Sequence, residues 1–289
     1  MTAQMQQSVN RTYKSTMFTM IFSDKKELLQ LYNAVAEKNY DDPELLTINT
    51  LENAIYMSIQ NDLSFIIDSR LSLYEHQSTY NPNLPLRYLF YIANLYQMMI
   101  KDKNIYGTKM VDIPAPRFII FYNGKEKQPE YRLLKLSDLY LIKEEHPALE
   151  LEAVMLNINP GHNHELLNAC KTLRDYSEYT TRVRKYAKDM SIEDAVEKAI
   201  TECIKEGILK EFLERNRLEA KAVSIYEYDQ EAHIRMERED AFEDGWLEGR
   251  NSIMKLIQRM TEAGELEQIP KLTKDKAFFE EMIKKYNIE

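Results

Sequence analysis

The sequence predicts an α/β fold in which a mixed central sheet is flanked by helices and followed by a helical C-terminal region. Two strand-forming runs adjoin at 61–68 and 71–79, a helical stretch at 86–100 follows, and another strand is expected at 117–122. A helix that joins neighbouring parallel strands is typical of α/β domains. With 289 residues, of which 44% are hydrophobic and 29% charged, the chain can bury the core that such a domain needs.

The elements up to residue 79 follow from apolar spacing. Apolar residues three and four positions apart across 15–36 predict a helix from about Asp24, with Ser23 or Asp24 as its N-cap. Near alternation of apolar residues across 45–59 predicts a first strand. The next two strands form a hairpin, because only Ser69 and Arg70 separate their apolar runs. Asp68, just before them, is expected to be a turn residue.

Turn residues divide the rest of the domain. Asn and Pro residues at 81–85 lead into the helix at 86–100, and the strand at 117–122 ends at an Asn-Gly turn. A further strand is expected at 148–157 and a helix at 165–187. Ser191 begins another helix with a capping-box-like start.

We expect three regions along the chain: an α/β domain at 1–190, a helical extension packed on it at 191–235, and a helical C-terminal region at 236–289. The last forty or so residues have too little apolar material to form a core alone, so they are expected to pack on a partner or on their own domain.

Two acids and an amide lie on the predicted hairpin. Asp62 precedes its first strand, and Glu75 and Gln77 share one face of the second because strand side chains alternate. If the strands splay at Asp62, the two carboxylates converge on one cation, and oxygen ligands of this kind suit Mg²⁺ or Mn²⁺. Glu52 is a further candidate acid, although an exposed strand residue is the preferred interpretation. His76 faces the other way and is expected to have a structural role.

These residues resemble the PD-(D/E)XK nuclease core, in which an Asp and a (D/E)-x-K bind the metal. The surrounding segments NDLSF (61–65), EHQST (75–79), NLPLR (83–87), FYNG (121–124) and EGILKEFL (206–213) are similar to the recombination-promoting nuclease family, whose members also carry the label transposase. The resemblance covers most of the chain and implies a restriction-endonuclease-like fold. Asp62 and Glu75 would be metal ligands, and Gln77 stands where Lys is usual. A neutral amide brings no charge to the site, so catalysis would depend more heavily on the metal.

The basic candidates for DNA binding are Arg87, Arg174, Arg182, Arg184 and Lys185. The last four lie in a basic interval of an otherwise acidic chain, whose net charge is −9. The alternatives are a surface salt bridge for Arg87 and an ordinary solvated helix face for the others.

Several other functions have little support. Cys170 and Cys203 lack metal-ligand spacing, His162 and His164 lack a third ligand nearby, and no Gly-x-Ser-x-Gly or phosphate-binding glycine loop is present. No apolar run is long enough to span a bilayer, and the first ten residues lack a signal-peptide core. We therefore expect a cytoplasmic protein without membrane partners.

The leading hypothesis is a Mg²⁺- or Mn²⁺-dependent DNA endonuclease linked to recombination or to defence against foreign DNA. The resemblance also implies a homodimer formed through the C-terminal helices. The alternative is a catalytically lapsed module that binds DNA or protein; a strand-transferring transposase follows only from the family label.

Overall fold

The computed structural model describes residues 16–49 and 62–288. It divides into two compact units, Met1–Asp229 and Gln230–Glu289. A long helix, α9 (Arg217–Glu262), begins in the first unit and ends in the second. The sequence-based boundaries at 191 and 236 bracket the observed division without coinciding with it.

The first unit is built on a mixed sheet, which confirms the predicted α/β class. Among the described residues the sheet has six strands in the order β1-β2-β3-β4-β6-β5. They are β1 (Thr47–Ile48), β2 (Leu63–Ile67), β3 (Arg70–Gln77), β4 (Ala115–Tyr122), β5 (Tyr131–Lys135) and β6 (Glu152–Asn157). The central strands β3, β4 and β6 are parallel, and the remaining pairs are antiparallel. The carboxyl ends of the three parallel strands therefore share one end of the sheet.

The hairpin between β2 and β3 turns one residue earlier than predicted. Asp68 and Ser69 are the turn residues, with φ values of 54° and 58°, and Arg70 already pairs with Ile67. Two-residue hairpin turns with positive φ match the right-handed twist of the strands, and Asp tolerates that conformation. The prediction of Asp68 as a turn residue is confirmed.

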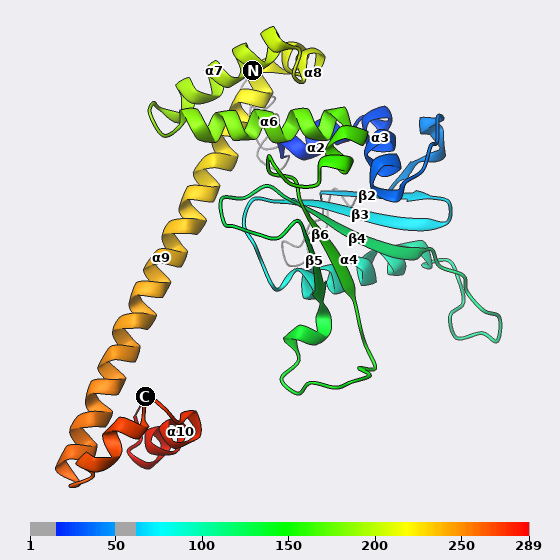
Figure 1. Cartoon of the computed structure of the whole chain (residues 1–289). Helices are drawn as coiled ribbons and strands as arrows, with labels where there is room; N and C mark the ends of the chain where they lie inside the picture. Colours follow the sequence, from blue (N-terminus) through cyan, green and yellow to red (C-terminus); the bar gives the residue numbers. More distant parts are fainter. Residues whose placement is uncertain (1–15, 50–61, 289) are drawn as a thin grey trace, which may run out of the picture. The chain divides into compact units, whose positions relative to one another are not determined.

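Helices cover both faces of the sheet (Figure 1). Helix α4 (Leu84–Met99) packs on one face, where Tyr88 and Tyr91 bury against Leu71 and Leu73 of β3. The other face carries α2 (Met17–Phe22), α3 (Lys25–Ala36) and α6 (Lys171–Tyr186). Alternate residues of β3 thus belong to two different apolar cores, as the period of two in a strand requires.

Several boundaries differ from the predicted ones. Asp24 caps α3 as expected, with its carboxylate accepting from the N–H of Lys26, and Ser191 caps α7 (Ile192–Glu206). Helix α4 begins two residues early because Pro85 fits the first helical turn. The helix expected at 165–187 is two helices, α5 (His164–Ala169) and α6, because Cys170 is extended. Of the strand expected at 45–59, Thr47–Ile48 is observed, and residues 50–59 lie outside the described part.

One strand was not predicted, and one was predicted too long. β5 is a five-residue edge strand whose charged and half-buried residues give no clear alternation, and its pairing with β6 supplies the stability that its own pattern does not indicate. β6 begins at Glu152, four residues after the predicted start.

The helices after α7 complete both units. In the first unit, α7 and α8 (Lys210–Arg215) bury Val196, Ile200 and Leu213 in the same core as α6. In the second unit, Leu256 and Met260 of α9 pack with Met282 of α10 (Lys276–Lys285). The expectation that the end of the chain cannot form a core alone is therefore wrong, because these few apolar residues bury one another. Short 3-10 helices lie at Pro43–Leu45, Leu136–Leu139 and Leu266–Lys271. Within residues 16–49 and 62–288, no helix has both the length and the apolar composition needed to cross a membrane.

Candidate active site

Asp62 and Glu75 face each other where the β2–β3 hairpin opens. The last registered pair of the hairpin is Leu63 with Tyr74, so the next pair outward is Asp62 with Glu75. The backbone N–H of His76 donates to Oδ2 of Asp62 at 2.7 Å, in place of a further strand-to-strand bond. The register of the hairpin and this hydrogen bond together place the two acids side by side, as the sequence predicted for splayed strands.

Glu75 receives two donors on a single oxygen. Its Oε1 atom accepts from Nε2 of Gln77 at 2.6 Å and from Nη2 of Arg87 at 3.0 Å. Glu75 is buried, with 5% of its side chain exposed, whereas 35% of the Arg87 side chain is exposed. The structure therefore brings together Asp62, Glu75, Gln77 and Arg87, four of the residues that the sequence selected.

The first turn of α4 explains how Arg87 reaches the strand. The backbone N–H of Arg87 donates to the Asn83 carbonyl as the helix begins, and Pro85 occupies its first turn. Six residues, 78–83, connect the end of β3 to α4, so this turn lies close to Glu75. Arg87 forms an ion pair, as the salt-bridge alternative proposed, but its partner is the candidate catalytic acid.

Burial raises the pKa of both carboxyl groups. The pKa of Glu75 rises to about 7, chiefly because its surroundings exclude water; Arg87 and the Gln77 amide oppose the rise, and the nearby charge of Asp62 adds to it. The pKa of Asp62 rises to about 6 for the same main reason, opposed by the His76 N–H and by Arg87. Two acids that share a dehydrated pocket with one guanidinium have an unbalanced charge, which a cation would relieve.

Tyr88 is a member of this site that sequence reasoning missed. It is 1% exposed, and its hydroxyl makes no hydrogen bond of normal geometry with any described residue. Burial raises the pKa of this hydroxyl well above its usual value, and the Glu75 and Asp62 charges raise it further. Tyr88 directly follows Arg87 in the helix, but the sequence pattern does not indicate that its hydroxyl lies near the two acids, because that depends on how α4 packs on the sheet.

His76 lies on the opposite face of β3. Its ring contacts Phe18 and accepts from or donates to the Tyr176 hydroxyl through Nε2, at 3.0 Å. Burial lowers the pKa of His76 to about 3, so the ring is neutral at ordinary pH. The predicted structural role fits these contacts, and the backbone N–H of His76 is the group that contacts the candidate site.

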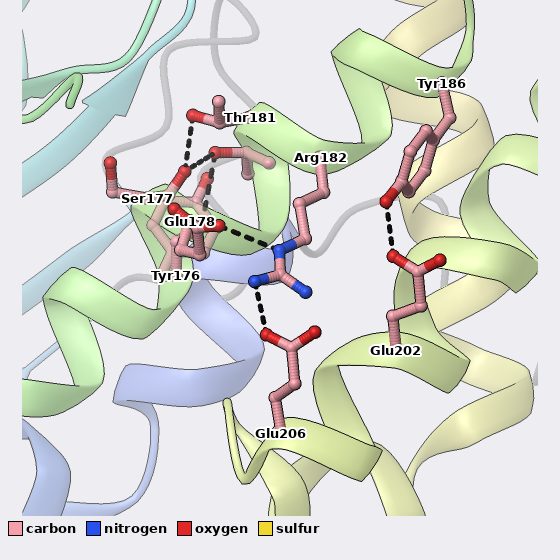
Figure 2. A network of polar contacts seen from close by, with 9 residues as sticks. Tyr176, Ser177, Glu178, Thr181, Arg182, Tyr186, Glu202 and Glu206 are labelled. Atoms are coloured by element: carbon pink, nitrogen blue, oxygen red, sulfur yellow. Dashed lines mark hydrogen bonds and ion pairs between the residues drawn. The ribbon is translucent and has the colours of Figure 1, made fainter.

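The basic residues of α6 lie on the face of the sheet opposite α4 (Figure 1). Arg182 is held by Glu206 at 2.6 Å and by Glu178 at 2.8 Å, and Figure 2 shows its guanidinium between these two carboxylates. These partners raise the pKa of Arg182. Its contacts are those of a residue that joins α6 to α7.

Arg184 is connected to the site through Asn123. Its Nη1 atom donates to Oδ1 of Asn123 at 2.7 Å, and the N–H of Asn123 donates to the Gln77 carbonyl at 3.0 Å. Arg174 and Lys185 are exposed on α6. Arg184 is therefore linked to Gln77 through one residue, a connection that spacing along the chain does not indicate.

The other candidate ligands do not form a metal cluster. Among the residues the structure describes, no group of three or more His, Cys, Asp or Glu side chains is arranged to hold a metal. Both cysteines are buried, and Glu52 lies outside the described residues. Comparison with models of known families, with curated proteins and with solved structures gave no match.

Proposed function

We propose that the chain is a divalent-metal-dependent DNA endonuclease whose metal ligands are Asp62 and Glu75. The observation that carries the proposal is the convergence of Asp62, Glu75, Gln77 and Arg87 at the open end of the hairpin. Mixed strands with a helix between β3 and β4 are also what a restriction-endonuclease-like core requires. The resemblance of these segments to recombination-promoting nucleases adds the substrate class, DNA, and a cytoplasmic site of action.

The donors at this site fit Mg²⁺ or Mn²⁺. Both carboxylates offer oxygen atoms, the type of ligand that these ions prefer. A third oxygen is available on the backbone. The N–H and C=O groups of a strand residue point to the same side, and the His76 N–H points at Asp62. The Gln77 carbonyl points the other way, to Asn123, which agrees with this alternation. The His76 carbonyl is thus directed toward the two acids.

The metal would polarise the scissile phosphate and lower the pKa of an attacking water. Glu75 and Asp62 would hold it, and their raised pKa values mean that they release protons when the ion binds. Gln77 donates its amide N–H to Glu75, which turns its carbonyl oxygen away from that acid. That oxygen can accept a hydrogen bond from water, so Gln77 would orient the nucleophile rather than supply charge.

A lapsed binding module is the second candidate. Two observations favour it: Gln77 brings no positive charge, and the guanidinium of Arg87 is bound to Glu75. Such a protein would keep the fold and the acidic pair but would not turn over DNA. Metal binding alone does not separate the two functions, whereas cleavage does.

Helix α9 supports association with a second copy of the chain. Phe242, Trp246 and Ile253 are exposed by 76%, 57% and 43%. At about 100° per residue these three side chains share one face of the helix. The same face continues to Leu256 and Met260, which are buried against α10. An apolar stripe that is covered over only part of its length suits a homodimer, which would bring two active sites to the two strands of a duplex.

Cleavage of supercoiled plasmid by purified protein tests the enzymatic function. We expect nicking or linear product with Mg²⁺ or Mn²⁺, none with EDTA, and none with Asp62→Asn or Glu75→Gln. Arg117→Gln, an exposed change on β4, is the matched control and should retain cleavage. Intact plasmid with every metal, from protein that melts cooperatively and binds DNA, would favour the lapsed module.

A further inference from the structure

The guanidinium of Arg87 lies beside the two acids and compensates their negative charge, as a bound cation would. Its guanidinium lowers the pKa of both Asp62 and Glu75, so its charge reaches the whole acidic pair. Within the described residues its ion-pair partner is Glu75. In the metal-free site, Arg87 therefore provides the compensation that buried carboxylates require.

The same oxygen cannot serve Arg87, Gln77 and a metal without rearrangement. Oε1 of Glu75 already accepts from both side chains, at 3.0 Å and 2.6 Å. Oδ2 of Asp62 accepts from the His76 backbone, which is fixed within the sheet. A divalent ion bridging the acids would come within a few ångströms of the guanidinium, and two cations at that separation repel each other.

Arg87 is also the partner that can leave. It is one-third exposed, whereas Glu75 is almost fully buried on a central strand. Its backbone is fixed by the helix bond to Asn83, so release requires only side-chain rotation. Gln77, by contrast, is neutral and adds no repulsion when a cation binds.

We propose that Arg87 is a resident counter-cation, which a divalent metal displaces from Glu75 so that the freed guanidinium binds the scissile phosphate. The step assumes the nuclease function proposed above and assigns Arg87 a direct contact with the substrate. No covalent bond changes; one ion pair is exchanged for a metal–carboxylate contact and an arginine–phosphate contact. Arg87 on α4 then supplies, once the metal has bound, the positive charge that a Lys at position 77 would otherwise supply.

Two simpler roles for Arg87 make different predictions. If the ion pair only stabilises the fold, its removal lowers stability and gives no gain in metal affinity. If Arg87 only contacts DNA, its removal weakens DNA binding and leaves metal affinity unchanged. Displacement alone predicts that metal binds more tightly once Arg87 is gone.

The test is titration of Mn²⁺ into the DNA-free full-length chain, followed by calorimetry or by loss of the free Mn²⁺ electron spin resonance signal. Arg87→Gln should bind Mn²⁺ on the order of tenfold more tightly than the unmodified chain, because a repelling charge has been removed. The Mn²⁺ affinity of Arg87→Lys should be close to that of the unmodified chain, and the affinity of Arg117→Gln should equal it. Equal or weaker binding by folded Arg87→Gln would overturn the inference.

A measurement on the unsubstituted chain avoids any dependence on how Arg87→Gln folds. Phenylglyoxal modifies accessible guanidinium groups, and peptide mass spectrometry reports the rate at Arg87. Displacement predicts a severalfold faster modification of Arg87 with Mg²⁺ than with EDTA, and protection when duplex DNA is added with Ca²⁺. An unchanged rate on metal addition, in protein that binds Mn²⁺, would overturn the inference and leave the metal site intact. Absence of Mn²⁺ binding by the unsubstituted chain would overturn the proposed nuclease function itself.

Discussion

The backbone N–H of His76 donates a 2.7 Å hydrogen bond to the carboxylate of Asp62. This bond joins β3 to the residue just before β2, one position beyond the last registered pair of the hairpin. Asp62 therefore has two roles: it continues the ladder with its side chain, and it presents a carboxylate to Glu75. The two roles can be separated by substitution.

Asp62→Asn should keep the fold and abolish metal binding. The Asn carbonyl oxygen can still accept from His76, so we expect the free energy of unfolding to stay close to that of the unmodified chain. Asp62→Ala removes the acceptor and should cost about 1–2 kcal/mol. Urea unfolding compares stability, and Mn²⁺ titration compares affinity. Full metal affinity in folded Asp62→Asn would remove Asp62 from the site.

The raised pKa values of Glu75 and Asp62 give the metal-free protein an unusual dependence of stability on pH. Both pKa values are higher in the folded chain, at about 7 and about 6, than the ordinary 4.5 and 3.8. The folded state thus holds protons that the unfolded state has released, and stability falls as pH rises from about 4 to about 7.

We expect the metal-free chain to lose several kcal/mol of stability across this range through these two groups, because a shift of one pKa unit corresponds to about 1.4 kcal/mol. Glu75→Gln should flatten the loss, and Asp62→Asn should flatten it to a smaller extent. Chemical denaturation in EDTA at pH 5 and at pH 8 measures the difference. If the unmodified chain loses no more stability between pH 5 and pH 8 than Glu75→Gln does, the raised pKa of Glu75 is contradicted. Added Mg²⁺ should restore stability at pH 8, because it binds the ionised pair.

The sequence predicted the parts of the site that depend on local pattern. Alternation along β3 placed Glu75 and Gln77 on one face, and turn residues predicted the hairpin that brings Asp62 opposite Glu75. The ion pair of Arg87 with Glu75 depends on how α4 packs on the sheet, and sequence spacing carries no such information. The sequence predicts a surface salt bridge as one alternative for Arg87, but it does not indicate the partner.

The same distinction explains the missed elements of the fold. β5 is stabilised by its pairing with β6, which lies seventeen residues further along the chain, rather than by its own apolar pattern. The break at Cys170 interrupts a stretch of good helix formers, and the buried environment of that residue is a tertiary feature. Caps such as Asp24 and Ser191 were predicted well because a cap is a local hydrogen bond.

Trp246 should be central to self-association if α9 forms a dimer. Its ring is 57% exposed and lies within the apolar stripe of Phe242 and Ile253. Trp246→Glu places a charge in that stripe, and we expect it to convert a dimer to monomer without unfolding the catalytic unit. Light scattering after size exclusion measures the mass. Glu280→Gln on α10, a solvent-facing change, is the control. A monomer from the unmodified chain would contradict the proposed dimer.

Gly124 should be intolerant of any side chain. A Cβ atom at this position would lie 2.1 Å from the Ser78 carbonyl oxygen and 2.4 Å from the Tyr122 hydroxyl. The Ser78 oxygen is backbone directly after Gln77, so relief requires a shift of the end of β3. We expect Gly124→Ala to cost about 2–4 kcal/mol and to weaken Mn²⁺ binding. Gly107→Ala, whose closest neighbour is a flexible Asn104 side chain at 3.3 Å, should be nearly neutral. If Gly124→Ala and Gly107→Ala are equally stable, the backbone around Gly124 can shift to accommodate a Cβ atom at little cost.

We expect the two basic residues Arg182 and Lys185 of α6 to have different roles: Arg182 stabilises the fold, and Lys185 contacts DNA. Arg182 is 17% exposed and is held by Glu178 and Glu206, whereas Lys185 is exposed to solvent. Removing one member of a well-ordered network leaves its partners uncompensated, so Arg182→Gln should lower the free energy of unfolding by about 1–3 kcal/mol. Lys185→Gln should be neutral for stability but should weaken duplex binding and reduce its salt dependence, because a phosphate contact is lost. Denaturation and fluorescence anisotropy at two salt concentrations measure the two effects. If instead Arg182→Gln weakens DNA binding at full stability, its guanidinium is available to DNA, and the two carboxylates release it on binding.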